Sequence, residues 1–161
     1  MSEQSVREAV NADGIKGIEA RFVVDVPPDA LVEILWDIRN FGRLFPDIEK
    51  VEKVGGSGDS LELAYRINAV VKKFSYVVRR TVDRAARTIT WREISGDFKA
   101  VRGGFRVEPH EAPGKSRVTY GAFVEVGRFV PTSLVRDVAM RKMDEMIGNV
   151  KRAAVALHGA G

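Results

Sequence analysis

The side chains best suited to chemistry on a small molecule lie between residues 65 and 120. Arg80 can hold a carboxylate or phenolate through its guanidinium group, and Tyr76 or Tyr120 can donate a hydrogen bond to a carbonyl oxygen. Glu93 adds a group that can act as an acid or a base. No motif marks any of them as catalytic, so the sequence assigns ligand-binding candidates and leaves the catalytic residues open.

Thiol and metal chemistry are not expected. The chain has no cysteine, which excludes disulfides and thiolate nucleophiles. Its two histidines, His110 and His158, fall in a predicted loop and in the C-terminal tail. A histidine-based metal site is therefore not predicted, and neither is a cofactor.

Alternating apolar residues predict strands that could position the candidate side chains. In residues 18–26 the even positions are all apolar and the odd positions include Glu19, Arg21 and Asp25, and Pro27-Pro28 ends the pattern. Pro28 then opens a short helix, and residues 41–46 form a compact apolar turn or a second short helix. Further strands are predicted at residues 47–54, 60–70, 73–82, 88–93, 98–107 and 117–127.

The C-terminal segment 131–157 predicts one long amphipathic helix with Pro131 in its first turn. Its apolar stripe follows the helical period through Val135, Ala139, Met143, Met146, Val150, Ala153 and Leu157. Short connections between the strands favour an antiparallel sheet. The predicted fold class is α+β: a curved seven-stranded antiparallel sheet, two short helices after the first strand, and a long helix lying over a space.

Strand registers predict which side chains face the helix. The turn after residue 82 places Arg80 opposite Trp91 and Val78 opposite Glu93, and the next hairpin places Trp91 opposite Ala100. Arg80 could then neutralise Glu93 or stack on Trp91 instead of binding a ligand. An aromatic residue on a strand also packs in the core more often than it contacts a ligand.

A bulge is needed for two of the aromatic residues to share a face. Phe98 is at an even position and Phe105 at an odd one, so a regular strand would place them on opposite faces. A one-residue bulge at Gly103-Gly104 would bring them to the same face. The helix contributes methionines that suit either an adaptable pocket wall or ordinary packing. The helix-facing set includes Arg102, and the predicted ligand-binding residues are Tyr65, Tyr76, Arg80, Trp91, Glu93, Phe98, Phe105, Tyr120, Met143 and Met146.

Length and composition favour one globular domain at residues 17–161, preceded by a polar leader at residues 1–16 that is either loose or a short extra helix. The chain shows no apolar run of about 18 residues and no N-terminal signal pattern. A cytoplasmic location is therefore expected. The sequence leaves the oligomeric state open.

Positive charge is concentrated in residues 71–106, which hold ten Lys or Arg and three Asp or Glu, against a chain total of +4. Such a block suits an anionic ligand, a membrane surface or RNA, and it equally suits the solvated outer face of a sheet. Aromatic side chains that stack on bases would be expected in an RNA-binding surface, and here they are predicted to face inward. Nucleic acid is therefore not an expected partner.

The order of elements resembles the helix-grip fold of the START and birch-pollen-allergen superfamily, and within it the polyketide cyclase/dehydrase group, which includes coenzyme Q-binding proteins. Residues 17–157 carry the resemblance. Its motifs are Val26-Pro27-Pro28, Trp36-Asp37-Ile38-Arg39-Asn40-Phe41 before Phe45-Pro46, Val51-Glu52, Thr90-Trp91, Ser95-Gly96-Asp97-Phe98, and Gly104-Phe105 before Val107 and Pro109.

The resemblance implies a deep apolar cavity that holds a hydrophobic or amphipathic small molecule. Three hypotheses follow: a carrier or sensor of a lipid, quinone or polyketide-like molecule with transient contact to a membrane surface, a polyketide aromatase/cyclase, and a ribosome- or RNA-associated module. The carrier is favoured, because it needs only the cavity and an entrance, whereas catalysis needs a placed acid or base.

Overall fold

The computed structural model describes residues 4–68, 73–127 and 132–160, with only the backbone of residues 132–136 and 138. The predicted helix start at Pro131 and the side chain of Val135 therefore lie outside the described residues. The elements in chain order are β1 (Ser5–Val10), β2 (Lys16–Val24), α1 (Pro28–Trp36), the 3-10 helix η1 (Ile38–Asn40), α2 (Phe41–Leu44), β3 (Ile48–Ser57), β4 (Ser60–Asn68), β5 (Lys73–Asp83), β6 (Thr88–Gly96), β7 (Ala100–Pro109), β8 (Ser116–Glu125) and α3 (Thr132–Ala160).

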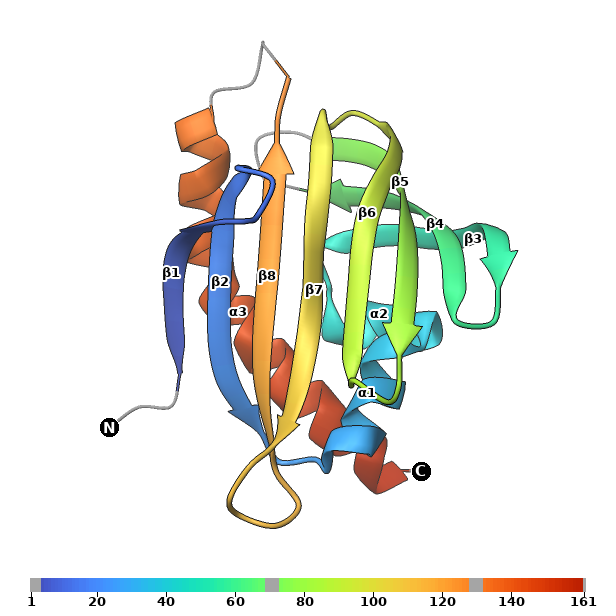
Figure 1. The fold of residues 1–161 in the computed structure, drawn as a ribbon, viewed down its shortest axis with the longest axis vertical. Coiled ribbons are helices and arrows are strands. Elements are labelled where there is room, and N and C mark those ends of the chain that lie inside the picture. The colour runs from blue at the N-terminus through green and yellow to red at the C-terminus, as the bar shows by residue number, and fades with distance from the viewer. Residues whose placement is uncertain (1–3, 69–72, 128–131, 161) are drawn as a thin grey trace.

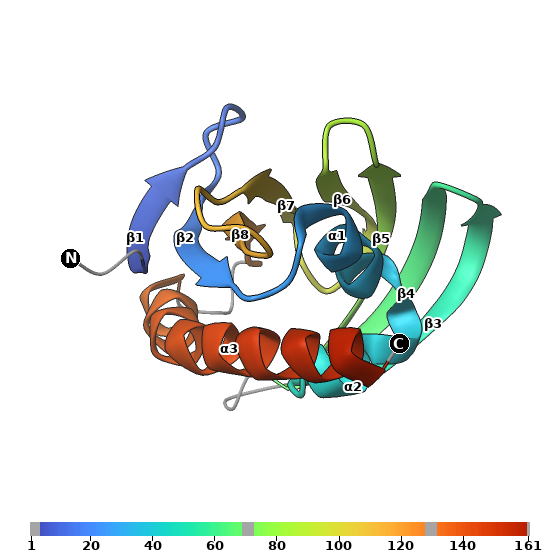
Figure 2. The same ribbon diagram turned by 90° about the horizontal axis from the view of Figure 1, so that it is seen from below.

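All the strands belong to one antiparallel sheet in the order β1-β2-β8-β7-β6-β5-β4-β3 (Figure 1). The sheet curves, and α3 crosses a single face of it (Figure 2). This confirms the predicted antiparallel sheet with two short helices after its first predicted strand and a long C-terminal helix. The strand number differs: the described residues form eight strands, and the prediction was seven.

The extra strand comes from the leader, for which the prediction of a loose segment or short helix was wrong. Ser5–Val10 pairs with β2 from Ser5 opposite Arg21 to Val10 opposite Lys16. In the connecting turn the Asn11 carboxamide accepts hydrogen bonds from the backbone N–H groups of Asp13 (3.0 Å) and Ile15 (2.9 Å). The alternation in SVREAV is too short to stand out, because an edge strand buries little of either face.

The long helix α3 buries one stripe, as predicted. Met143, Val150 and Ala153 are buried, and Ile147 and Ala154 join them. The helix packs against β2, α1 and α2, with a smaller contact to β1. No helix of the described part of the chain combines the length and the apolar character needed to cross a membrane.

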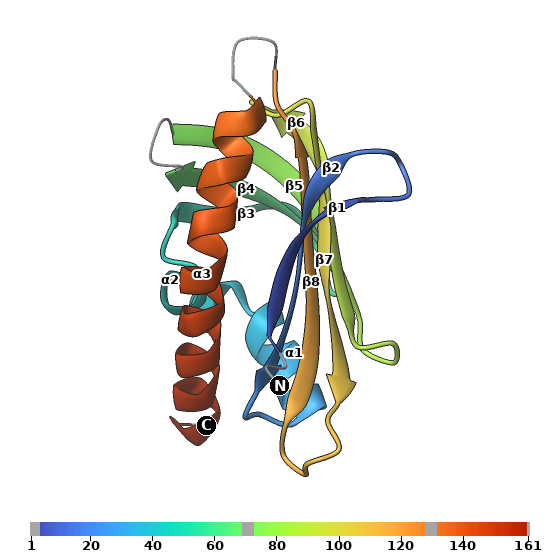
Figure 3. The same ribbon diagram turned by 90° about the vertical axis from the view of Figure 1, so that its left-hand side faces the viewer.

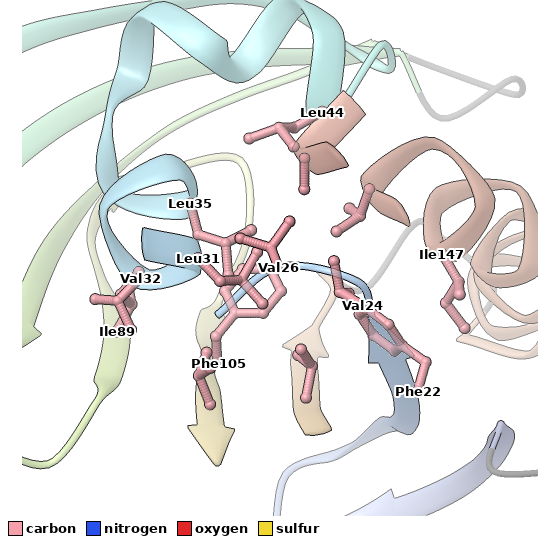
Figure 4. Close-up of a cluster of buried hydrophobic side chains, with 14 of the residues drawn as sticks. Phe22, Val24, Val26, Leu31, Val32, Leu35, Leu44, Ile89, Phe105 and Ile147 are labelled. Carbon is pink, nitrogen blue, oxygen red and sulfur yellow. The ribbon is translucent and has the colours of Figure 1, made fainter. Parts of the chain in front are cut away.

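The helix α1 forms a wedge between α3 and the sheet (Figure 3). It begins with Pro28 at a position where the missing N–H costs nothing. Leu31, Val32 and Leu35 are fully or almost fully buried, and the helix contacts α3 on one side and β6 and β7 on the other. Figure 4 shows Leu31 and Leu35 among the buried side chains of β2 and of the segment that follows it. At this end of the molecule the space beneath α3 is therefore filled.

The predicted register of the β5–β6 hairpin is confirmed, with Arg80 opposite Trp91 and Val78 opposite Glu93. Trp91, however, pairs with Gly103 and not with Ala100. The hairpin prediction failed because β6 runs on to Gly96, while β6 and β7 pair only from residues 88–92 to residues 102–106. In residues 93–101 β6 and β7 thus do not pair with each other, because residues 93–96 pair only with β5 and residues 100–101 only with β8.

The predicted bulge at Gly103-Gly104 is also wrong. β7 pairs with β8 along its whole length without a register shift, and Phe98 lies before the strand begins. Gly103 serves a different purpose: a Cβ atom there would lie 2.5 Å from the indole ring of Trp91 and 2.5 Å from the carbonyl oxygen of Gly121. The missing side chain is what lets the indole lie across β7.

Arg80 connects the sheet to α1. Its side chain is 2 % exposed, and its guanidinium group donates to the carbonyl oxygens of Leu35 (2.7 Å) and Trp36 (2.9 Å), the last residues of α1. Helix C-termini carry unpaired carbonyl groups and partial negative charge, so a cation is favoured there. The group also lies over the rings of Phe41 (4.7 Å) and Trp36 (5.2 Å). Burial lowers the pKa of Arg80 to about 10, which still leaves it charged at neutral pH.

Replacing Arg80 with methionine should destabilise the fold. The substitution keeps a long buried side chain but leaves the two carbonyl groups without donors, which is expected to cost about 2–3 kcal/mol of unfolding free energy. Urea unfolding would measure this loss. Arg79→Met, at a neighbouring position that faces the opposite side of the sheet, should change stability by no more than about 0.5 kcal/mol. An Arg80→Met protein as stable as the wild type would show that α1 does not depend on this contact.

Candidate functional site

A cavity of about 700 Å³ lies between α3 and the sheet. It occupies the end of the space that α1 does not fill, where β8 ends and α3 begins. Its wall is mostly apolar and comes from β1, β2, β4, β5, β8 and α3, together with Asp47, Phe98 and Val126. The lining residues are Glu8, Ala9, Val10, Lys16, Gly17, Ile18, Asp47, Ile67, Asn68, Phe74, Phe98, Tyr120, Ala122, Val124, Val126, Ala139, Lys142, Met143 and Met146.

Four of the predicted ligand-binding residues lie on this wall: Phe98, Tyr120, Met143 and Met146. Phe98 stacks on Phe74, another wall residue, with ring centroids 4.6 Å apart. The two methionines come from α3, one turn apart along its buried face. Both alternatives considered for the methionines are thus present, because Met143 and Met146 line the cavity while Met143 is part of the packed core and Met146 packs against it.

Four other aromatic candidates form a layer behind the wall. Tyr76 contacts Phe98 at 5.1 Å between ring centroids, and Tyr65 contacts Tyr76 at 5.3 Å. On the other side, Phe105 and Trp91 pack against Tyr120 at 4.9 and 5.9 Å. The structure thus joins these residues to the cavity through wall aromatics and does not place them on the cavity surface.

Arg80 and Glu93 do not meet. Arg80 is held by the end of α1, and it stacks on Trp36 and Phe41, so the expected contact with Trp91 is replaced by these rings. Glu93 pairs with Arg102 at the point where β6 gains one residue over β5. Both predicted partners for Arg80 were wrong, because register fixes which strand positions lie opposite each other and not where a long side chain ends.

Arg102 was predicted to face the helix, and its register contradicts this. It pairs with Arg92 on β6 and with Phe123 on β8, both on the outer side of the sheet. With Trp91 opposite Gly103, the regular alternation of β7 places Arg102 on the outer face. Arg79, Arg92 and Arg102 form one row across three strands, so this part of the basic block covers the outer face, while Lys72 lies outside the described residues.

Several wall residues were not among the candidates. Ile18, Ile67 and Phe74 belong to predicted strands, and their inward parity was visible in the sequence. Their position at one end of the sheet was not visible, because it depends on where α1 fills the space. Glu8, Ala9 and Val10 were missed together with β1.

The polar groups of the cavity are few. Lys142 of α3 forms an ion pair with Asp47 at 3.0 Å, and this contact joins the helix to the turn before β3. The Tyr120 hydroxyl forms no hydrogen bond with any residue that the structure describes. Since the tyrosine lines the cavity, its hydroxyl is available to a bound molecule as a donor.

Burial controls the acidity of the tyrosines. Loss of hydration raises the pKa of Tyr65 to about 12 and that of Tyr120 to about 12, and it raises the pKa of Tyr76 still further, with smaller contributions from Tyr65 and Tyr120. The hydroxyl of Tyr120 is thus a stable neutral donor at physiological pH. It is a poor general base, because a base works best with a pKa near the working pH.

A sequence model of the protein family described as "Polyketide cyclase / dehydrase and lipid transport" matches residues 17–155. No curated protein sequence matches the chain at a significant level.

Solved structures share the fold. Human STARD10 superposes with a TM-score of 0.77 at 16 % identity, over 96 % of this chain and 70 % of that one. A START superfamily protein from Mycobacterium smegmatis gives 0.74 at 15 % identity, over 86 % and 97 % of the two chains. The Zhui aromatase/cyclase from Streptomyces sp. R1128 gives 0.70 at 16 % identity, over 96 % and 94 %. At such identities the likeness concerns the fold alone, and it confirms the predicted helix-grip architecture.

The tyrosines should titrate late in the folded protein. All three tyrosines of the chain have a pKa raised by burial, whereas in the unfolded chain each ionises near pH 10. Because the folded state holds these protons more tightly, the stabilisation is complete below pH 10 and declines as the pH rises from about 10 towards 12. Absorbance at about 295 nm should therefore rise near pH 10 only in urea; a native rise at pH 10 would contradict the buried positions.

Proposed function

The chain belongs to the polyketide cyclase/dehydrase and lipid transport family, and we propose that it binds and carries a hydrophobic or amphipathic small molecule in the cavity beneath α3. A lipid, a quinone and a polyketide-like molecule are the classes that fit. The observation that carries this proposal is a mostly apolar cavity of about 700 Å³, within the range typical of ligand sites. Apolar burial supplies most of the binding free energy in such a site, and a few polar groups orient the ligand.

We favour ligand binding and transport over catalysis because of the partners and positions of the candidate acids and bases. Arg80 donates hydrogen bonds to the carbonyl oxygens at the end of α1, and Glu93 forms an ion pair with Arg102. Neither belongs to the cavity wall. Tyr120 does, but its raised pKa suits hydrogen-bond donation and not proton abstraction at neutral pH. A polyketide aromatase/cyclase is the second candidate, supported by the family description, and turnover of a poly-ketone substrate would establish it.

Native mass spectrometry of the purified protein, followed by organic extraction, tests carriage most directly. A stoichiometric apolar molecule would support the proposal and identify the chemical class. A protein that is empty and also fails to take up an uncharged hydrophobic probe, such as N-phenyl-1-naphthylamine, would contradict it.

Filling the cavity should abolish probe uptake without unfolding the protein. Ala139→Trp places an indole on the cavity side of α3 and should weaken N-phenyl-1-naphthylamine binding by about tenfold or more, as measured by fluorescence titration. Val155→Trp adds the same ring at an exposed position of α3 and is expected to bind the probe like the wild type. Equal binding by both variants would place the probe outside the cavity, and circular dichroism would establish that both are folded.

A further inference from the structure

The cavity is polar at particular places only. Its deep wall is built from apolar residues of β5, β8 and α3, whereas the charged lining residues form two groups. One group is Asp47 and Lys142, where the turn before β3 faces α3. The other is Glu8 and Lys16, on the first hairpin of the chain. Asn68 and Tyr120 are the neutral polar members of the lining. A bound amphiphile with an ionised end would therefore place that end at one of the two charged sites.

The first of these groups is already neutralised. Lys142 and Asp47 form an ion pair at 3.0 Å, with the Lys142 side chain 30 % exposed. A ligand head bound there would have to displace a carboxylate that the fold itself provides. Such an exchange gains little, because one ion pair is broken for each one formed.

Lys16 is different. Lys16 is the first residue of β2 and lies opposite Val10 on β1. It is two residues before the buried Ile18 and therefore on the same face of the strand, at the end of β2 that borders the cavity. It forms no ion pair with any residue within the described ranges. Val10, Ile18 and Val124 share the wall with it. Lys16 itself is exposed, so the attraction that it exerts on an anion is the modest one of a solvated ion pair, and the apolar wall beside it supplies the rest of the binding free energy.

Glu8, the acid that shares the cavity wall with Lys16, forms no ion pair with it. Glu8 is opposite Ile18 and therefore lies diagonally across from Lys16 on the neighbouring strand. The turn between the strands is fixed by the Asn11 carboxamide and by Gly14 with φ +78°, so the position of Lys16 is set by a short hairpin. Glu8 and Lys16 both precede residues 17–155, the segment that the family model matches.

We propose that the cavity takes an amphiphile with a carboxylate head, and that Lys16 on the first hairpin binds that head while the apolar body lies against β8 and α3. This inference rests on the proposed function, since it names the chemical class of the ligand that the same cavity would carry. It makes the first hairpin a specificity element: β1 supplies one wall of the entrance, and the first residue of β2 supplies the charge.

Competition between matched amphiphiles tests the inference. Hexadecanoic acid, hexadecanol and hexadecylamine would each displace N-phenyl-1-naphthylamine from the wild type at pH 8. The acid should bind about fivefold more tightly than the alcohol, the size expected of a partly exposed ion pair. Lys16→Gln should remove that preference, each displacement being referred to the variant's own affinity for the probe. Lys16→Glu should reverse it, so that the amine binds more tightly than the acid.

Lys53→Gln is the matched control, because Lys53 is an exposed lysine on β3 outside the cavity wall. It should keep the wild-type preference. Equal displacement by acid and alcohol in the wild type would overturn the carboxylate inference while leaving carriage intact. A preference that survives in Lys16→Gln would overturn the role of Lys16. A wild-type protein that binds neither the probe nor any amphiphile would overturn the proposed function, and the inference with it.

Discussion

The buried charge of Arg80 is the constraint on which the arrangement of this protein depends. A guanidinium group with almost no exposed surface is costly unless every side of it is satisfied. No carboxylate does this in the described structure; the carbonyl oxygens at the end of α1 and the faces of two aromatic rings do. The sheet and α1 therefore have to be in register with each other, since moving α1 by one turn would leave the cation alone in the core.

The position of α1 in turn decides where the cavity lies. A long straight helix over a curved sheet leaves space beneath it, and close packing demands that the space be filled wherever residues can reach. α1 fills one end with Leu31, Val32 and Leu35, which pack between α3 and the sheet. Nothing of comparable size enters from the other end among the described residues. The cavity is thus what remains of the space under α3 after the wedge is in place.

The cavity wall and the aromatic layer behind it have different roles. Phe98 and Tyr120 face the cavity, and each is backed by further rings from β4–β7. Gly103 allows Trp91 to lie within this layer, because no other residue would leave room for the indole. A stiff aromatic backing holds the wall in place when the cavity is empty, which reduces the ordering cost of binding. Among the acid–base candidates, Arg80 and Glu93 are held by other parts of the structure, and burial raises the pKa of the tyrosines.

Local pattern in the sequence was enough to predict the strands, the two short helices, the long helix and the β5–β6 register. These features depend on periodicity and on a short turn, and both can be seen within a dozen residues. The leader strand was not predicted, because an edge strand of six residues carries little hydrophobic signal. The predicted site contained two aromatic residues and two methionines that lie on the cavity wall, but it lacked Phe74 and included residues one layer too deep. Alternation along a strand says which face a side chain is on and not how far along that face it lies.

Only the tertiary structure decided the rest. That Arg80 would bind the end of α1 depends on a contact between residues 44 and 45 positions apart in the chain. The partner of Glu93 depends on a bulge in β6, and the site of the cavity depends on how deep α1 reaches beneath α3. That Glu8 and Lys16 share the cavity wall became visible only once β1 was paired with β2. Each of these facts is a distance between segments that meet on folding, and no local pattern of apolar and polar residues carries that information.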